Sequence, residues 1–181
     1  KHFLAVCGEL VRRNTGIQWN AFSRVDTISP EIVETMAKAG CQAICFGVES
    51  GSQQILDLVK KQSSLHLVKE AMRMTQNAGI SALASFIIGL PGETEETLRQ
   101  TVAFADELHQ EFGSLYGFHI LALFPGSEVR EKAADYGLEI LTNDWTKYDA
   151  NHVVTRSKGL DTGAVQAVAD SYDGAMERYL R

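Results

Sequence analysis

The chain has 181 residues, a mass of 19.9 kDa, 45% hydrophobic and 22% charged residues, and a formal net charge of −6. These values are ordinary for a soluble globular domain, and they exclude a disordered chain, a collagen-like repeat and a coiled coil. The longest apolar run, residues 86–90, is far shorter than the ~20 residues that span a bilayer, and the acidic balance provides no basic field for a nucleic acid.

The cysteine count and the first residues indicate the context of the chain. Three cysteines, an odd number, favour free thiols in a reducing cytoplasm over a disulfide framework. The sequence begins Lys-His-Phe, without an initiator Met or a signal peptide. We therefore expect a cytoplasmic protein, and we expect this chain to be cut from a longer one.

Glycines that follow amphipathic stretches predict where several helices end. They are Gly16, Gly40, Gly79 and Gly137, and a strand-like run follows the first three directly. We expect helices near residues 1–14, 30–39, 52–61, 64–78, 94–110, 127–136 and 162–180, and strands near residues 17–24, 41–48, 80–88 and 115–123. Residues 138–161 show no clear period, so we expect a wrapping loop there.

Hydroxyl-bearing residues predict how some of these helices begin. Ser29 precedes Pro30 as an N-cap. Ser50 and Gln53 have the spacing of a capping box, and Thr162 is in place to cap the last helix.

Four strands that alternate with helices indicate an α/β fold with a parallel sheet. Because side chains alternate along a strand, each strand has one bulky apolar face and one smaller or more polar face. The polar face carries Asn20, Arg24, Cys45, Gly47, Glu49, Ser85 and His119. Unpartnered buried polar groups cost about 1–3 kcal/mol each, so we expect a polar ligand at the C-terminal strand ends, where βα-barrel sites lie. A flat doubly wound sheet with an internal Arg24–Glu49 ion pair is the alternative.

The local motifs exclude some common sites. Gly47-Val-Glu-Ser-Gly lacks the dinucleotide-binding pattern. Cys41 and Cys45 would lie about 13 Å apart along a strand, too far to share one metal ion, so we expect core thiols and no metal site. Ser85-Phe-Ile-Ile-Gly-Leu-Pro-Gly-Glu-Thr predicts a strand, a tight turn and a helix start, with the acidic residues after Gly92 at the positive helix N-terminus.

In combination, the motifs resemble the radical SAM superfamily. The resemblance rests on Phe46-Gly-Val-Glu-Ser-Gly-Ser-Gln-x-Ile-Leu, then Lys60-Lys61, then Phe-Ile-Ile-Gly-Leu-Pro-Gly-Glu-Thr. It covers roughly residues 1–150 and points to the branch of methylthiotransferases, oxygen-independent coproporphyrinogen oxidases and cobalamin-binding proteins. Arg24-Val-Asp and Phe124-Pro-Gly-Ser also match that branch, and Asp144-Trp-x-x-Tyr-Asp is similar to a segment of its cobalamin-binding members.

The resemblance implies a partial (βα) barrel with S-adenosylmethionine across the C-terminal strand ends, where a 4Fe-4S cluster cleaves it to a 5′-deoxyadenosyl radical. By motif position it assigns cofactor-binding roles to seven residues. Glu49 and Ser85 would contact the ribose, Lys61 the methionine carboxylate, Ile87 and Gly89 the adenine, His119 the closing strand of the pocket, and Arg24 the carboxylate or the substrate.

One family motif is absent. The chain has no C-x-x-x-C-x-x-C loop, which holds the cluster in the family. We therefore expect a fragment of a radical SAM iron–sulfur oxidoreductase that is inactive alone, with no catalytic residue. The parent protein, rather than this fragment, would bind S-adenosylmethionine and the 4Fe-4S cluster. The similarity of the segment at Asp144 to cobalamin-binding members adds cobalamin as a candidate cofactor of the parent. Residues 1–140 would form the partial barrel, and residues 141–181 a wrapping loop and an amphipathic helix.

Two alternatives stay open. A βα-barrel lyase or aldolase would use Lys60 or Lys61 as a Schiff base, and a non-catalytic binding module would dock a partner through a sheet edge. The strand at 17–24 would leave such an edge unpaired, so we expect an edge-mediated homodimer of the fragment. The expected partner of the parent is a small-molecule substrate, with no membrane and no nucleic acid.

Overall fold

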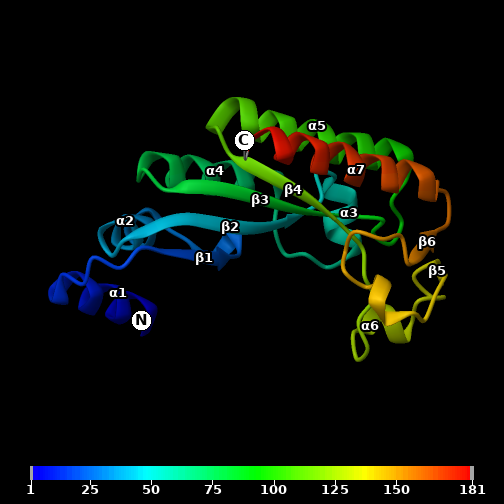
Figure 1. Ribbon diagram of the computed structural model, residues 1–181, viewed down its shortest axis with the longest axis horizontal. Helices are drawn as coiled ribbons and strands as arrows, with labels where there is room; N and C mark the ends of the chain where they lie inside the picture. The colour runs from blue at the N-terminus through cyan, green and yellow to red at the C-terminus, as the bar shows by residue number, and fades with distance from the viewer. Residues whose placement is uncertain (1, 180–181) are drawn as a thin grey trace. The chain divides into compact units, whose positions relative to one another are not determined.

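The computed structural model describes residues 2–179, and the side chains of residues 2–172 (Figure 1). Four strands form one parallel sheet in the order β1-β2-β3-β4. They are β1 (Trp19–Ser23), β2 (Cys41–Glu49), β3 (Ser81–Ile88) and β4 (Leu115–Ile120). The predicted α/β class, with four parallel strands and helices outside them, is therefore confirmed.

The chain divides into two compact units. The first unit comprises the residues up to 48 with residues 63–85 and 105–116, and the second comprises residues 49–62, 86–104 and those from 117 onward. The division falls within β2, β3 and β4, and the predicted boundary after residue 140 stays a prediction.

The predicted helices are observed with one exception. They are α1 (His2–Arg13), α2 (Pro30–Lys38), α3 (Gln53–Leu58), α4 (Leu65–Asn77), α5 (Glu95–Phe112) and α7 (Thr162–Tyr179), with the short 3₁₀ helix η1 (Val25–Thr27) after β1. The prediction for 127–136 was wrong, because only α6 (Glu128–Glu131) is helical and residues 132–137 form turns. Ser127 donates its hydroxyl to the Phe124 carbonyl at 2.6 Å, so it does not cap α6.

The expected wrapping loop at 138–161 contains regular structure. Strands β5 (Leu138–Ile140) and β6 (Thr155–Ser157) pair antiparallel, and the 3₁₀ helix η2 (Trp145–Lys147) lies between them in sequence (Figure 1). Leu138 and Ser157, which face each other, are buried. Three residues are too few for an alternating pattern to show in the sequence, which explains the missed strands.

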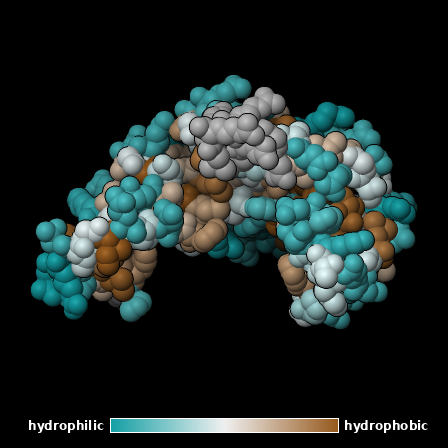
Figure 2. Space-filling view, in the orientation of Figure 1, coloured by the Kyte–Doolittle hydropathy of each residue, from teal (hydrophilic) through white to brown (hydrophobic). Residues whose placement is uncertain are grey.

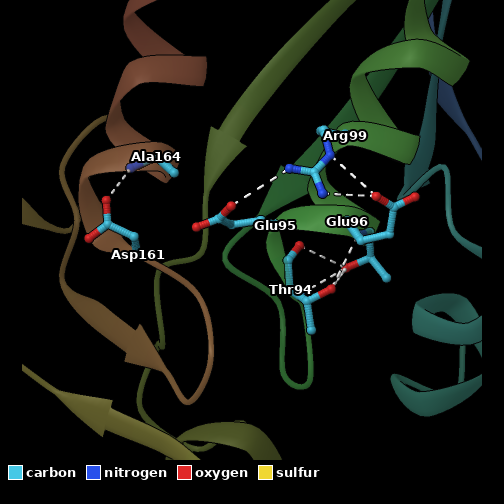
Figure 3. A network of polar contacts seen from close by, with 7 residues as sticks. Thr94, Glu95, Glu96, Arg99, Asp161 and Ala164 are labelled. Carbon is cyan, nitrogen blue, oxygen red and sulfur yellow. Dashed lines mark hydrogen bonds and ion pairs between the residues drawn. The ribbon is translucent and has the colours of Figure 1, made fainter.

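Side-chain oxygens cap several of the helices. Ser29 accepts from the Ile32 N–H at 3.3 Å, as predicted. The predicted Thr162 cap was wrong, because Asp161 accepts from the Ala164 N–H at 3.1 Å (Figure 3). At the start of α5, Thr94 accepts from the Thr97 N–H at 3.3 Å (Figure 3).

The expected alternation along the strands is confirmed. On β2, Ile44, Phe46 and Val48 are at most 1% exposed, whereas the residues between them are half-buried. On β3, the side chains of Phe86 and Ile88 are fully buried, whereas those of Ser85 and Ile87 are half-buried. β2 and β3 therefore each pack one apolar face into the core and leave the other face partly open.

Apolar side chains also reach the surface of the first unit. Along α1, Phe3, Val6 and Val11 are exposed, and Figure 2 shows hydrophobic surface there. On β1, Phe22 is 91% exposed. The predicted homodimer through the edge of β1 stays a prediction. No helix among residues 2–179 is long and apolar enough to cross a membrane.

Two helix-terminating glycines provide a matched test of packing. Both have positive φ, +94° at Gly40 and +72° at Gly79. A Cβ added at Gly40 would lie 2.2 Å from the Ile17 carbonyl oxygen, whereas a Cβ added at Gly79 would have no neighbour within 4 Å. We expect Gly79→Ala to lower the free energy of unfolding by about 1 kcal/mol, the cost of a left-handed Cβ. Gly40→Ala should cost about 3 kcal/mol, because the clash is added.

Urea unfolding of both variants measures these costs. Equal losses at the two positions would contradict the close approach of the Ile17 carbonyl to Gly40.

Candidate functional site

The turn that follows β2 has an uncommon backbone conformation. Glu49, the last residue of β2, has φ +71°, in the left-handed region that favours glycine. Such a conformation costs about 1–2 kcal/mol in a residue with a Cβ. Residues held in this way cluster at functional sites, and Glu49 is one of four such non-glycine residues that the structure describes.

Glu49 forms an ion pair with Lys61, which the family resemblance assigns to the same ligand. The Lys61 Nζ donates to Glu49 Oε1 at 2.7 Å, and both side chains are mostly buried, at 15% and 22% exposed. Lys61 lies just after α3, where its N–H donates to the Leu56 carbonyl at 2.9 Å. The structure thus brings together two residues that the sequence assigned to one ligand.

The neighbouring Lys60 has a different partner. Its Nζ donates to Glu128 at 3.3 Å in an exposed pair. The hydrogen bond to Glu128 raises the pKa of Lys60 above its ordinary value. The ammonium form is therefore stabilised, which is the opposite of what a Schiff-base lysine needs.

The turn from Glu49 to α3 is held by contacts that the sequence did not predict. Ser50 and Thr101 are fully buried, and their hydroxyl oxygens lie 3.1 Å apart. The Gly51 N–H also donates to Thr101 Oγ1 at 3.1 Å. The predicted Ser50–Gln53 capping box was wrong, because Ser50 Oγ accepts from the Ser52 N–H instead.

The loop that follows β3 is held by a buried carboxylate. Gly89 has φ +84°, and its N–H donates to Glu93 Oε2 at 2.6 Å. Glu93 is fully buried, and its Oε1 has no hydrogen-bond partner among the described residues. Burial raises the pKa of Glu93 to about 7, against a smaller lowering by the N–H groups of Gly89 and Leu90.

Glu93 was expected beside the acidic residues at the helix start, but its environment differs from theirs. Glu95 and Glu96 are exposed and pair with Arg99 at 3.6 and 2.9 Å (Figure 3). The sequence offered no signal for the difference, because all three carboxylates precede or open the same helix.

The remaining predicted site residues are divided between the two units. Arg24 belongs to the first unit and pairs with Asp26 at 2.7 Å, whereas Glu49 belongs to the second unit and pairs with Lys61; the alternative Arg24–Glu49 ion pair stays a prediction. Ser85 is half-buried at the end of the first unit's part of β3. In the second unit, Ile87 packs against an apolar cluster and His119 is exposed on β4.

A cavity of about 200 Å³ lies beside the loop after β3 in the second unit. Its apolar wall includes Val59, Leu90, Leu121 and Tyr136, with Lys60 and Glu128 at its edge. Pockets that enclose a drug-sized ligand measure about 300–1,000 Å³, so this cavity alone is too small for a nucleoside cosubstrate.

The three cysteines are free thiols. Cys7 and Cys41 are buried, which raises the pKa of each thiol, and Cys45 is half-buried. Within residues 2–179, no three His, Cys, Asp or Glu side chains are grouped so that they could hold a metal ion. These residues therefore do not fit an iron–sulfur cluster.

Comparison with known proteins gives a family and several relatives. The model of the radical SAM superfamily matches residues 3–105, more than half of the chain. An uncharacterized methyltransferase of Pyrococcus horikoshii is 34% identical over 142 residues, which cover 78% of this chain and 30% of that protein. The anaerobic magnesium-protoporphyrin IX monomethyl ester cyclase of Rubrivivax gelatinosus is 27% identical over all of this chain and 31% of its own length. The chain thus spans about a third of these relatives.

Two solved structures show the same fold. The radical S-adenosylmethionine methyltransferase TsrM of Kitasatospora setae, with cobalamin and a [4Fe-4S] cluster bound, matches 90% of this chain and 33% of its own with a TM-score of 0.66 and 19% identity. Coproporphyrinogen III oxidase (HemN) of Escherichia coli, a radical SAM enzyme, matches 76% of this chain and 38% of its own with a TM-score of 0.57 and 15% identity. At these identities the matches establish the fold, that of part of a radical SAM barrel.

The buried Glu93 carboxylate predicts a pH dependence of stability. The unfolded state releases the proton near pH 4.5 and the folded state near pH 7. Between these values the folded state holds more protons, so stability is highest below pH 4.5 and falls until about pH 7. We expect this group to contribute a loss of about 3 kcal/mol across that window.

Chemical unfolding of Glu93→Gln between pH 5 and 8 tests this assignment, with the exposed Glu96→Gln as the control. Glu93→Gln should flatten the fall in stability, and Glu96→Gln should leave it in place. An unchanged slope in Glu93→Gln would show that another group is responsible.

Proposed function

Because the chain belongs to the radical SAM superfamily, we propose that it supplies the S-adenosylmethionine-binding part of a radical SAM oxidoreductase. The observation that carries this proposal is the ion pair of Glu49 and Lys61 at the end of β2. It places a carboxylate and an ammonium group, both mostly buried, beside a strained backbone.

The chemistry of this pair fits the two polar ends of S-adenosylmethionine. A carboxylate accepts hydrogen bonds from a ribose diol, which Glu49 would do, and an ammonium group binds a carboxylate, as Lys61 would do with the methionine end. Each group satisfies the other, so neither is an unpaired charge in a mostly buried position. Binding would exchange this ion pair for bonds to the cosubstrate.

The loop after β3 complements the ion pair. Gly89 is buried and has φ +84°, a conformation that glycine adopts without strain, and a Cβ there would contact Leu121 and Val165. We assign the adenine to Ile87 and Gly89, a ribose contact to Ser85, a carboxylate or substrate contact to Arg24, and the closing strand to His119. When bound, S-adenosylmethionine supplies the radical chemistry of the superfamily.

The cluster that this chemistry requires would be held by residues outside the described ones, since these do not fit it. We propose that a C-x-x-x-C-x-x-C loop elsewhere in the full-length protein provides the ligands, and that this chain alone is inactive. The coding sequence upstream of Lys1 tests this directly, because a full-length gene without such a motif would contradict it.

The similarity to methyltransferases, among them one solved with cobalamin bound, favours the cobalamin-binding branch of the family. We propose cobalamin as a further cofactor of the full-length protein, a small molecule as its substrate and the cytoplasm as its location. The Schiff-base alternative is weaker for Lys60, whose ammonium form Glu128 stabilises.

Adjacent lysines provide a matched test of S-adenosylmethionine binding. Lys61→Met removes the ammonium that would hold the methionine carboxylate, and a charge-assisted hydrogen bond contributes about 1.5–3 kcal/mol. We expect roughly 10- to 100-fold weaker binding of S-adenosylhomocysteine to the full-length protein by calorimetry. Lys60→Met, which removes only the exposed pair with Glu128, should change the affinity by less than about two-fold.

Equal affinities for the two variants would contradict the role of Lys61. A wild-type protein that binds neither S-adenosylmethionine nor S-adenosylhomocysteine would contradict the proposed function as a whole.

A further inference from the structure

The strained turn at Glu49 has a support on helix α5. The Gly51 N–H and the Ser50 hydroxyl both contact Thr101 Oγ1, each at 3.1 Å. Thr101 in turn donates its own proton to the Thr97 carbonyl at 3.0 Å. Ser50, Ser52 and Thr101 are at most 4% exposed, so water does not compete for these bonds.

The direction of each bond follows from the capacity of a hydroxyl, which is one donor and two acceptor positions. Thr101 uses its proton on the Thr97 carbonyl, so it must accept from both Gly51 and Ser50. The Ser50 hydroxyl therefore donates to Thr101, and its oxygen accepts from the Ser52 N–H at 3.1 Å. The Thr101 hydroxyl therefore uses its one donor and both acceptor positions. Valine has the same shape but no hydroxyl, so it could not make these bonds.

The same turn packs closely against α5 at Gly51. A Cβ at Gly51 would lie 2.7 Å from Thr101 Cα, 2.7 Å from Phe104 Cβ and 2.8 Å from the Gln100 carbonyl oxygen. The backbone of the turn therefore lies directly on the helix, and a displacement of Thr101 would be transmitted to it.

The hydrogen-bond network of Ser50, Gly51, Ser52 and Thr101 connects to both members of the ion pair. On one side it begins at the residue next to Glu49 in the chain. On the other side, the Ser52 carbonyl accepts from the N–H groups of Ile55 and Leu56 in the first turn of α3. The Leu56 carbonyl accepts from the Lys61 N–H at 2.9 Å, so the same short segment sets the position of Lys61.

We propose that Thr101 is a positioning residue of the S-adenosylmethionine site, which holds Glu49 in its left-handed conformation through the turn at Ser50 and Gly51. The proposal rests on the proposed function. Thr101 touches neither partner of the ion pair, and it acts by making an unfavourable backbone conformation the stable one. Its loss would let Glu49 relax toward an extended conformation and carry the carboxylate away from the ribose.

The test compares Thr101→Val with Thr101→Ser in the full-length protein, with S-adenosylhomocysteine as the probe in calorimetry. Valine keeps the shape but leaves the Gly51 N–H and the Ser50 hydroxyl buried without partners. We expect at least ten-fold weaker binding for Thr101→Val and recovery to within about two-fold of the wild type for Thr101→Ser, which keeps the hydroxyl.

A matched control is available on α4. Thr75 is also fully buried and donates to the carbonyl four residues earlier, that of Ala71, at 2.7 Å. Thr75→Val therefore removes a comparable helix bond in the first unit. The affinity of Thr75→Val for S-adenosylhomocysteine should equal that of the wild type, even if its melting temperature falls as much as that of Thr101→Val.

A double-mutant cycle with Glu49→Gln separates positioning from general stability. If Thr101 acts through the Glu49 carboxylate, Thr101→Val should weaken binding by less than about three-fold in the Glu49→Gln background. The same ten-fold loss in both backgrounds, or wild-type affinity of Thr101→Val, would overturn the proposal. If Thr101→Val does not fold, Ser50→Ala provides the same cycle, with the same outcomes expected.

The outcomes also separate this inference from the proposed function. If the wild type binds and Glu49→Gln weakens binding but Thr101→Val does not, only the positioning role fails. If the wild type does not bind the probe, both fail.

Discussion

A left-handed backbone at one non-glycine residue is the constraint on which the candidate site depends. Glu49 ends a fully extended strand and turns with φ +71°, and this places its carboxylate 2.7 Å from Lys61, a residue twelve positions later. The conformation is unfavourable in isolation. It is stable here because Gly51 fits against α5 and because the Thr101 hydroxyl satisfies two donors of the turn.

The first half of α5 and Glu93, two residues before the helix, support two separate loops of the second unit. Thr101 holds the turn after β2, and Glu93 holds the loop after β3 through the Gly89 N–H. Both supporting side chains are fully buried, and neither is among the residues expected to touch a ligand. In the proposed site, the expected contact residues would lie on strand ends, and buried polar residues would fix the backbone next to them, an arrangement that would preorganise binding.

Much of the fold could be predicted from the sequence because its signals are local. Alternation on β2 and β3, the glycines that end helices and the Ser29 cap each depend on a few neighbouring residues. The strand β5 could not be predicted, and the helix expected at 127–136 proved much shorter, because three or four residues carry no period. Motif resemblance placed Glu49 and Lys61 in one site, but it could not show their ion pair. The roles of Glu93 and Thr101 depend on burial and on contacts with residues distant in the chain, as the fifty positions between Ser50 and Thr101 illustrate.

We propose that the Glu49–Lys61 pair opens to receive S-adenosylmethionine. A crystal structure of the full-length protein with S-adenosylhomocysteine bound would test this. We expect ribose hydroxyls within hydrogen-bond distance of Glu49, the ligand carboxylate on Lys61, and the bonds from Ser50 and Gly51 to Thr101 unchanged. A ligand bound elsewhere, with the Glu49–Lys61 ion pair intact, would contradict it.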